Sequence, residues 1–409
     1  MKKNILMISW FFPPLNSTAS KRAGCFAKYL PKFGWQPVVI CPDWGPDNCI
    51  YDREFVKNIP ESVEVVTVPH EIKKTHSSFV SAASRVRNLV VPDLIPYDWW
   101  QNARLKLSDL FAKRKFSMIW STSPDALQHA LASWASRKWA VPWIADFRDV
   151  YGELKKVPIG DSLKYPIRLF NEKKRIKSAA EIVTVSDALA EVLAKRHRRN
   201  VHVIPNGFDP DDIADFSEQY IQKLPKFNIA YTGTLIFPQR NPRSVLEAIN
   251  QLIKAGKVDK KDISIDFYGI DRRILGKFLA GYNDEHLIRV FGKVTSAECA
   301  KVQRSSAILL QLAHANEKGI MTGKIFEYLA AFRPILSIPS DNDCIDKLLT
   351  ETTAGVSCTS VEEIATQVLI WYNEWKATGT IKSAANKNAI LRYSRREQTK
   401  QLSELLNNL

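Results

Sequence analysis

The sequence lacks three features that would each indicate a particular class of protein. It has no apolar run long enough to cross a bilayer as a helix, so any membrane contact would be peripheral. Its six cysteines show no close-paired spacing typical of metal sites, and several stand in apolar runs, which indicates buried thiols of a reduced, cytosolic protein. It shows no low-complexity segment and no short internal repeat. The apolar run Ile5–Phe12 has some features of a secretion signal, but it is short and Pro13-Pro14 follows at once, so we expect a cytoplasmic protein.

The positive charge of this chain is concentrated in its first half. The 409 residues suit two domains of about 200 residues each. Residues 1–205 contain 32 Lys and Arg against 19 Asp and Glu, whereas the remainder contains 26 against 24. A field confined to one half predicts an anionic partner there, which could be nucleic acid, an anionic membrane surface or a phosphorylated substrate.

Short apolar segments alternate with amphipathic helical segments along most of the chain. The strands expected in the first half are Asn4–Trp10, Gln36–Cys41, Val63–Pro69, Met118–Thr122, Trp143–Asp146, Ile182–Ser186 and Val201–Pro205. Those expected in the second half are Asn228–Thr232, Ile263–Tyr268, Arg289–Gly292, Ala307–Leu312, Pro334–Ile338 and Gly355–Cys358. This alternation predicts an α/β protein with two doubly wound parallel sheets, joined by a hinge near residues 206–215. Ligands of such sheets bind outside the carboxyl ends of the strands.

The segment Thr322–Pro339 combines a helix start, a helix and a strand. Thr322 suits the N-cap, and Gly323 lets a ligand approach the backbone. Free N–H groups and the helix dipole favour an anion at such a terminus, and Lys324 adds a full charge. Glu327, one turn further on, can accept two hydrogen bonds from a vicinal diol such as a ribose. These residues alone fit either a nucleotide site or the solvent face of a capped helix.

Two segments of the first half are basic and irregular. Ser77–Lys106 interleaves aromatic and apolar residues, including Trp99 and Trp100, with cations. This pattern fits the interface of an anionic bilayer, or a long connection that packs its own side chains on the domain. Lys155–Lys177 fits either a membrane-binding stretch or a solvated helix face.

Several local motifs occur in a fixed order along the chain. They are Trp10-Phe-Phe-Pro-Pro14, Ser121-Thr-Ser-Pro124, Ala145-Asp-Phe-Arg-Asp149, Val185-Ser186, Ile204-Pro-Asn-Gly-Phe-Asp209, Tyr231-Thr-Gly-Thr-Leu235 and Gly323-Lys-Ile-Phe-Glu-Tyr-Leu-Ala330. Together they resemble the retaining glycosyltransferases of family four, over nearly the whole chain. Single motifs of this set are common, whereas the ordered set is specific.

The resemblance implies the GT-B architecture, in which two Rossmann-like domains face a cleft. Residues 1–207 would form the acceptor domain, residues 208–389 would bind the nucleotide sugar, and a helix over about 390–409 would pack back on the first domain. The implied reaction moves a hexosyl or N-acetylhexosaminyl group from a UDP- or GDP-linked donor, with retention at the anomeric carbon. The implied acceptor is a lipid-linked or polysaccharide precursor. No separate cofactor and no metal are implied.

The donor residues follow from the same resemblance. Glu327, at the last position of the family's Glu-x7-Glu motif, would bind the ribose, while Lys324 and the amides near Gly323 would face the diphosphate. Two basic residues usually follow the Tyr231-Thr-Gly233 strand end; here Thr234 replaces the first and Arg240 best matches the second. The other implied donor-binding positions are Gly233, Thr322, Glu317, Gly319 and Asn206.

One departure from the family pattern concerns the sugar. Gly319 stands eight positions before Glu327, where the family's first Glu contacts the sugar hydroxyls. Glu317 could substitute only in a differently shaped loop, so the motif does not identify the sugar.

The acceptor side involves residues of the first half. Lys21 and Arg22 begin a predicted helix and fit either a phosphate of the acceptor or surface cations. His129 fits either a polar group near the transferred sugar or a packed core histidine. The remaining acceptor-side residues, which end a strand and could equally form a structural ion pair, are Asp146, Arg148 and Asp149.

The anionic partner that best fits this resemblance is the cytoplasmic membrane face, with the protein bound peripherally. A sugar-nucleotide epimerase of the same architecture is an alternative, but it needs acid and base groups that the sequence does not clearly offer. A nucleic-acid-binding protein is a second alternative, for which the sequence shows no helix-turn-helix, zinc finger or aromatic-basic RNA motif.

Overall fold

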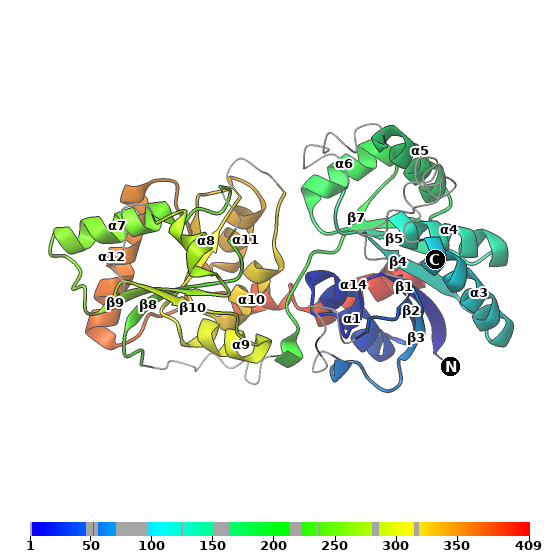
Figure 1. The fold of residues 1–409 in the computed structure, drawn as a ribbon, viewed down its shortest axis with the longest axis horizontal. Coiled ribbons are helices and arrows are strands. Elements are labelled where there is room, and N and C mark those ends of the chain that lie inside the picture. Colours follow the sequence, from blue (N-terminus) through cyan, green and yellow to red (C-terminus); the bar gives the residue numbers. More distant parts are fainter. Residues whose placement is uncertain are drawn as a thin grey trace, which may run out of the picture. The chain divides into compact units, whose positions relative to one another are not determined.

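The computed structural model describes residues 2–45, 52, 56–70, 97–123, 126–150, 164–212, 223–235, 238–279, 286–314 and 319–409. The chain divides into two compact units. The first consists of Met1–Pro205 together with Arg395–Leu409, and the second of Asn206–Ser394. Each unit is built around its own parallel β-sheet (Figure 1).

The first unit contains a seven-stranded sheet in the order β3-β2-β1-β4-β5-β6-β7. Its strands are β1 Lys3–Ser9, β2 Trp35–Pro42, β3 Glu64–Val68, β4 Met118–Thr122, β5 Trp143–Phe147, β6 Glu181–Thr184 and β7 His202–Val203. Every neighbouring pair is parallel, and each strand ends within two residues of its predicted bounds. The predicted doubly wound sheet is therefore confirmed.

Helices cover both faces of this sheet because successive side chains of each strand point to opposite faces. The helices are α1 Thr18–Tyr29, α3 Tyr97–Lys113, α4 Ala126–Trp139, α5 Tyr165–Ile176, α6 Asp187–His197 and α14 Arg395–Asn407, with the short 3-10 helix η1 Leu30–Phe33. On one face α3, α4 and α6 pack on Ile8, Ile40 and Ile119. On the other, α1 and α14 pack on Met7 and Val39 (Figure 1).

Helix α1 begins three residues before the predicted start at Lys21. Ser17 adopts an extended conformation, and its hydroxyl accepts a hydrogen bond from the Ser20 N–H, so Ser17 is the N-cap. The regular helix ends at Tyr29 because Pro31 lacks an N–H, and η1 carries the chain on to Gly34 in the left-handed region.

The second unit contains a six-stranded sheet in the order β10-β9-β8-β11-β12-β13. Its strands are β8 Phe227–Thr232, β9 Ile263–Tyr268, β10 Ile288–Phe291, β11 Ile308–Leu312, β12 Ile335–Ile338 and β13 Gly355–Ser357. Its helices are α7 Arg243–Lys254, α8 Arg272–Gly276, α9 Ser296–Ser305, α10 Gly323–Ala331, α11 Cys344–Thr352, α12 Val361–Thr378 and α13 Lys387–Leu391, with the 3-10 turn η4 Pro210–Asp212. Helices α7 and α12 cover one face, and α10 and α11 the other (Figure 1).

The predicted strand–helix–strand unit around Thr322 is present as β11, α10 and β12. Strands β11 and β12 are parallel neighbours, with Leu309 opposite Ile335. Helix α10 buries Ile325 and Leu329 against the sheet and ends at Phe332, which takes a left-handed conformation. Its first turn therefore stands at the carboxyl end of β11, where ligands of such sheets bind.

Candidate functional site

The turn after β8 brings backbone unusually close to a side chain of α10. Gly233 has φ +131°, a conformation that L side chains rarely adopt. A β-carbon at this position would overlap the Lys324 Nζ atom. Gly233 is held in place because its N–H donates to the carbonyl of Tyr268 at 2.9 Å. Any residue larger than glycine would thus displace the ammonium group of Lys324.

Lys324 lies in the first turn of α10 with its ammonium group desolvated. The Nζ atom is 4.1 Å from the centroid of the Tyr231 ring, a cation–π contact. Among the described residues it forms no ion pair. Burial, with the nearby positive charge of Arg240, lowers the pKa of Lys324 to about 7, against the opposing effect of Glu327. A positive charge at a helix N-terminus favours the approach of an anion.

Arg240 provides the second positive charge at this position. Its Nε–H donates to Nε2 of His314 at 3.0 Å, and Nη1 donates to the carbonyl of Thr234 at 3.2 Å. The Tyr231 hydroxyl donates to the same carbonyl at 2.8 Å. Thr234, which replaces the family's first basic residue, thus orients Arg240 through its backbone oxygen, and its own side chain adds no charge.

Tyr328 fixes α10 to the end of β8. The Thr232 N–H donates to the Tyr328 hydroxyl at 3.0 Å, and Gln303 from α9 donates to the Thr232 hydroxyl at 3.0 Å. All three residues are buried. This network positions the first turn of α10, and with it Lys324, relative to Gly233.

The other predicted donor residues lie on or near α10. Thr322 occupies the predicted N-cap position in an extended conformation, and its side chain makes no capping hydrogen bond. Glu327 is partly buried on the same helix. Gly319 has φ +73°, and its N–H donates to an Asp343 carboxylate oxygen at 2.7 Å. Glu317 lies outside the described residues.

His314 was not singled out from the sequence, and Tyr231 was noted only as part of a motif, without a role in the site. His314 follows β11, and β11 is the sheet neighbour of β8. Its position after a predicted strand could have indicated this, because the carboxyl ends of adjacent parallel strands lie at the same edge of the sheet. Asn206, also predicted to bind the donor, is the first residue of the second unit and is buried. In the sequence it lies well before the other residues of this site.

The predicted acceptor-side residues centre on a buried ion pair in the first unit. The Arg22 Nη2 and Nε atoms lie 2.7 Å and 3.0 Å from the two carboxylate oxygens of Asp146. Arg22 Nη1 also donates to the carbonyls of Ile204 and Pro205, and the Thr122 hydroxyl donates to Asp146 at 2.7 Å. Both charged side chains are fully buried. The structure therefore places Arg22 in a structural contact and not on the surface.

The neighbours of this pair differ in exposure. Lys21 and Arg148 are partly exposed, and Asp149 is exposed. The Arg148 N–H donates to the Ser123 hydroxyl at 3.2 Å. Burial lowers the pKa of Arg148, although Asp149 raises it.

His129 lies in the core of the first unit, on α4. Its Nδ1 atom is 2.8 Å from the Ser121 hydroxyl, and its ring lies 4.6 Å from the centroid of Phe147 and 6.0 Å from that of Trp143. Burial lowers the pKa of His129 to about 4, so the imidazole is neutral at pH 7. These contacts are those of a packed core histidine.

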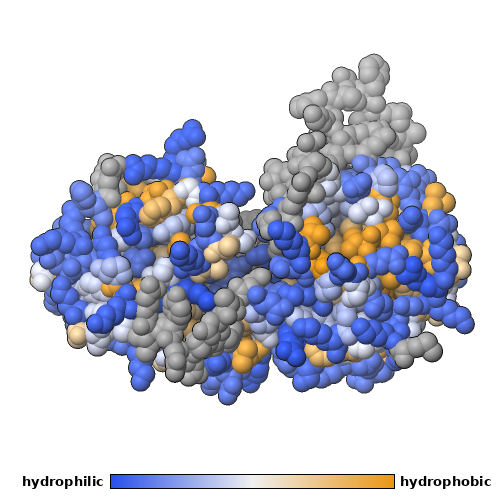
Figure 2. Space-filling model, turned by 90° about the horizontal axis from the view of Figure 1, so that it is seen from below, coloured by the Kyte–Doolittle hydropathy of each residue, from blue (hydrophilic) through white to orange (hydrophobic). Residues whose placement is uncertain are grey.

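The surface of the first unit carries exposed apolar groups beside cations. Leu105 on α3 is 70% exposed and Phe170 on α5 is 67% exposed, and Figure 2 shows an apolar area on this unit among hydrophilic residues. Phe170 is followed at helical spacing by the exposed Lys173, Lys174 and Lys177. Trp99, for which the sequence left a bilayer interface and packing on the domain open, is fully buried and packs edge-on against Trp10. Part of the predicted basic segments, residues 77–96 and 155–163, lies outside the described residues.

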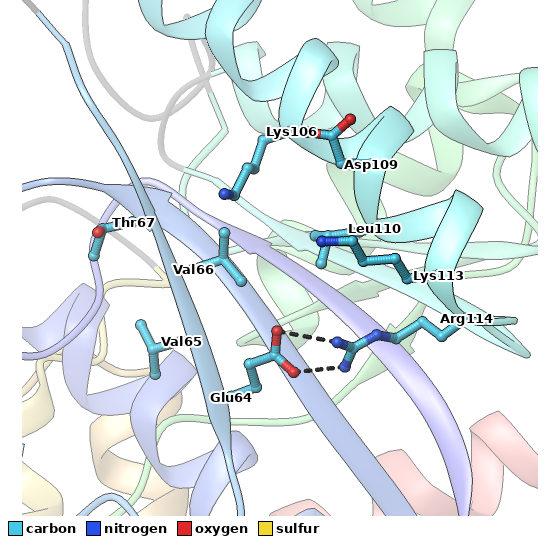
Figure 3. Close-up of a pocket in the computed structure, with 9 residues that line it drawn as sticks. All are labelled: Glu64, Val65, Val66, Thr67, Lys106, Asp109, Leu110, Lys113 and Arg114. Atoms are coloured by element: carbon cyan, nitrogen blue, oxygen red, sulfur yellow. Dashed lines mark hydrogen bonds and ion pairs between the residues drawn. The ribbon is translucent and has the colours of Figure 1, made fainter.

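A pocket of about 320 Å³ lies between β3 and α3 of the same unit (Figure 3). Arg114 and Glu64 pair at 2.6 Å along one side of it. Lys106, Asp109 and Lys113 line the α3 side, so the pocket is lined by charges of both signs. No described helix is long and apolar enough to cross a membrane, and the described residues contain no group of three or more His, Cys, Asp or Glu arranged to hold a metal.

Two doubly wound parallel-sheet units in one chain define the GT-B class of fold. Residues 18–207 match the family model of a glycosyl transferase 4-like domain, and residues 255–404 match that of a glycosyl transferase-like domain. The chain therefore belongs to the GT-B glycosyltransferases that combine these two domains, and it is a glycosyltransferase. Comparison of the sequence with curated proteins finds no match.

Solved structures of the same fold cover nearly the whole chain. Anabaena HepE, determined in complex with UDP and glucose, is 14% identical, with a TM-score of 0.63 and complete coverage of both chains. A glycosyltransferase from Rickettsia africae is 15% identical, with a TM-score of 0.64, covering 100% of this chain and 98% of its own. WaaG, a glycosyltransferase involved in lipopolysaccharide biosynthesis, is 12% identical, with a TM-score of 0.62, covering 99% of this chain and 100% of its own. At these identities the similarity shows the fold alone.

Proposed function

We propose that the second unit binds a nucleotide sugar through Lys324, Arg240 and the N-terminus of α10, and that the protein transfers the sugar with retention of anomeric configuration. The observation that carries the proposal is the desolvated Lys324 ammonium, which has no ion pair in the described part of the chain and faces Gly233. Burying such a cation is unfavourable unless an anion compensates it. A diphosphate supplies that anion, and the HepE complex makes UDP-glucose the first donor to test.

The reaction requires positive charge beside the departing diphosphate. Cleavage of the anomeric C–O bond moves an electron pair onto the departing diphosphate oxygen, while positive charge develops on the sugar ring. Lys324 and Arg240 would stabilise the diphosphate, and the amides at the start of α10 would add to this. The acceptor hydroxyl would attack the same face of the sugar and pass its proton to the leaving diphosphate, so no protein nucleophile is needed.

Glu327 would bind the donor ribose. It is partly buried, one turn beyond Lys324 on the same helix. A carboxylate in a closed site accepts two hydrogen bonds from a ribose diol at a fixed distance from the diphosphate. The identity of the transferred sugar, a hexosyl or an N-acetylhexosaminyl group, would depend on the residues that precede Gly319.

The acceptor in this proposal is a lipid-linked or polysaccharide precursor at the cytoplasmic face of the membrane. The basic first unit supports this, with Leu105 and Phe170 exposed beside cations. Apolar side chains flanked by lysines suit the headgroup region of an anionic bilayer.

A calorimetric panel of UDP, GDP, ADP and their sugars tests the donor half of the proposal. We expect one diphosphate family to bind at micromolar concentration, and its nucleoside alone to bind far more weakly. A sugar that binds is then incubated with enzyme and membrane extract, and the products are examined by NMR. Formation of an epimerised nucleotide sugar without transfer would contradict the proposal, as would the absence of any nucleotide binding.

A further inference from the structure

Strand β3 forms one edge of the sheet of the first unit, and in the described part of the chain its only strand neighbour is β2. The carbonyl of Val68 accepts a hydrogen bond from the Asp43 N–H at 2.9 Å, so Val68 directs its backbone groups towards β2. The backbone groups of successive strand residues point to opposite sides. Val65 and Thr67 therefore direct their N–H and C=O groups away from β2, towards the open edge.

The open part of this edge is short and is closed at both ends. The next outward-facing position on one side is Val63, whose N–H donates to the carbonyl of Pro60 at 2.9 Å. The next on the other side is Pro69, whose carbonyl accepts from the side chain of Asn102 at 3.3 Å. Between these positions, the outward-facing N–H and C=O groups have no hydrogen-bond partner among the residues that the structure describes. Such free donors and acceptors are a template for another strand.

The side chains of β3 also permit a strand to pair at this edge. Val65 and Thr67 are exposed on one side of the strand, whereas Glu64 and Val66 point towards α3 (Figure 3). Val65 and Thr67 are β-branched, and such side chains favour cross-strand packing. The strand sequence contains no proline and no lysine, the residues that commonly prevent pairing at an exposed edge.

We infer that β3 pairs with β3 of a second copy of this chain, antiparallel and about a two-fold axis at Val66. In this register Val65 of each copy lies opposite Thr67 of the other, and the two residues exchange N–H···O=C bonds in both directions. The two pairs related by the axis use every free N–H and C=O group of both open edges. Val66 lies opposite its own counterpart as a pair without hydrogen bonds, as its β2-facing backbone groups require.

The charges along the edge fit the same arrangement. Helix α3 runs beside β3, with Arg114 paired to Glu64 at the amino end of the strand and Asn102 bonded to Pro69 beyond its carboxyl end. Lys106 lies one turn after Asn102 and lines the pocket beside β3. Antiparallel pairing brings the Glu64 end of one copy to the Lys106 end of the other, so opposite charges meet. An extended segment of another protein has no such match built in, so a second copy is the occupant that this edge favours.

Sedimentation velocity of the full chain, from low to high micromolar concentration, measures the association. We expect the 46.5 kDa monomer to shift towards a dimer as the concentration rises. Thr67→Pro removes an outward-facing N–H group but no donor of the β2 ladder, so it should weaken the dimer about tenfold or more. Thr67→Val keeps the backbone donor and the β-branched shape, and as the matched control it should associate like the parent. Val65→Lys keeps every backbone group, places a charge beside the partner strand, and should also weaken the dimer if the proline variant does not fold.

Cysteine cross-linking tests the register of the pairing. Val66→Cys places a thiol of each copy beside the axis, where a pair without hydrogen bonds has its side chains close together. Val65→Cys is the matched control, because Val65 is 38% exposed against 9% for Val66 but lies away from its own counterpart. Mild air oxidation should therefore cross-link the Val66→Cys protein far more than the Val65→Cys protein or the parent.

Three results would overturn the inference. One is a parent protein that stays monomeric at every concentration, as it would if the edge served an extended peptide of another protein. The second is a folded Thr67→Pro or Val65→Lys variant that associates as strongly as the parent. The third is equal cross-linking of the two cysteine variants.

Discussion

The ammonium group of Lys324 lies 4.1 Å from the centre of the Tyr231 ring and occupies the space where Gly233 would carry a side chain. This contact joins β8, which carries Tyr231, to α10, the helix after β11, which carries Lys324. The ring face attracts the cation, but it supplies no counter-charge. The donor diphosphate would complete the site.

Removing either functional side chain of α10 should abolish transfer without unfolding the protein. We expect Lys324→Ala and Glu327→Ala to reduce kcat/KM strongly, with Glu327→Ala costing about 2–4 kcal/mol of transition-state stabilisation, because each side chain would bind a polar group of the donor. Lys254→Ala, an exposed lysine of α7, is the control and should be neutral. Near-normal turnover in either α10 variant, measured with an intact thermal transition, would refute their assignment to the site.

Gly233→Ala should weaken both the stability of the fold and the binding of the nucleotide, whereas a control with backbone strain alone should weaken only stability. The new β-carbon would displace the Lys324 ammonium, so affinity for the nucleotide found in the calorimetric panel should fall, and stability should fall by about 1–2 kcal/mol. Gly256→Ala is a matched control: Gly256 also has a positive φ, +67°, but a β-carbon there would meet no other atom within 4 Å. It should lose stability alone. Unchanged nucleotide affinity in Gly233→Ala, measured by calorimetry, would contradict the geometry described for Lys324.

Nucleotide binding should take up a proton near neutral pH. The pKa of Lys324 is about 7 in the free protein, and a bound diphosphate would raise it, so affinity should be constant below pH 7 and fall as pH rises above 7, by up to about tenfold per pH unit. Calorimetry in two buffers of different ionisation enthalpy measures the number of protons. Lys324→Arg, which stays charged, should bind without this proton uptake; if it takes up the same number, another group is responsible.

The unit around His129 should lose stability in acid. His129 has a pKa of about 4 when folded and about 6.5 when unfolded, so the unfolded chain binds more protons between these values. The free energy of unfolding should therefore decrease as pH falls from 6.5 to 4, by up to about 3 kcal/mol from this residue. Denaturation of His129→Gln across this range should show a shallower pH dependence. An identical slope in the variant would mean that other groups cause the acid instability.

The protein should bind anionic vesicles reversibly. Each Lys or Arg near an anionic bilayer contributes about 1 kcal/mol, and the exposed Phe170 would add an apolar contact. Cosedimentation should fall with salt and with the double change Lys173→Glu and Lys174→Glu, while nucleotide affinity stays the same. Lys254→Glu with Lys257→Glu makes the same charge change on exposed lysines of the second unit and should have little effect. Equal binding to neutral vesicles, or none to either kind, would assign the basic field to a soluble anionic acceptor.

The sequence by itself determined the two sheets and the position of α10. Each strand is a short, mainly apolar run bounded by polar or turn residues, and this pattern is visible in the local sequence, as at Met118–Thr122 and Ile263–Tyr268. The signal for the helix that follows β11 is also local, since the helix begins at Gly323 and Lys324 and is capped at its C-terminus by Phe332.

The tertiary structure decided which side chains line the candidate site and which are buried in contacts with their own unit. Arg22 and Asp146 are 124 positions apart, and their pairing depends on α1 packing over the ends of β4 and β5, which no local pattern encodes. The burial of Trp99 and His129 also depends on distant parts of the chain. Periodicity shows that a residue lies on the apolar face of a helix, but it does not show which element covers that face. For the same reason Tyr231 and His314 come together in the candidate site only because β8 and β11 pair as neighbours.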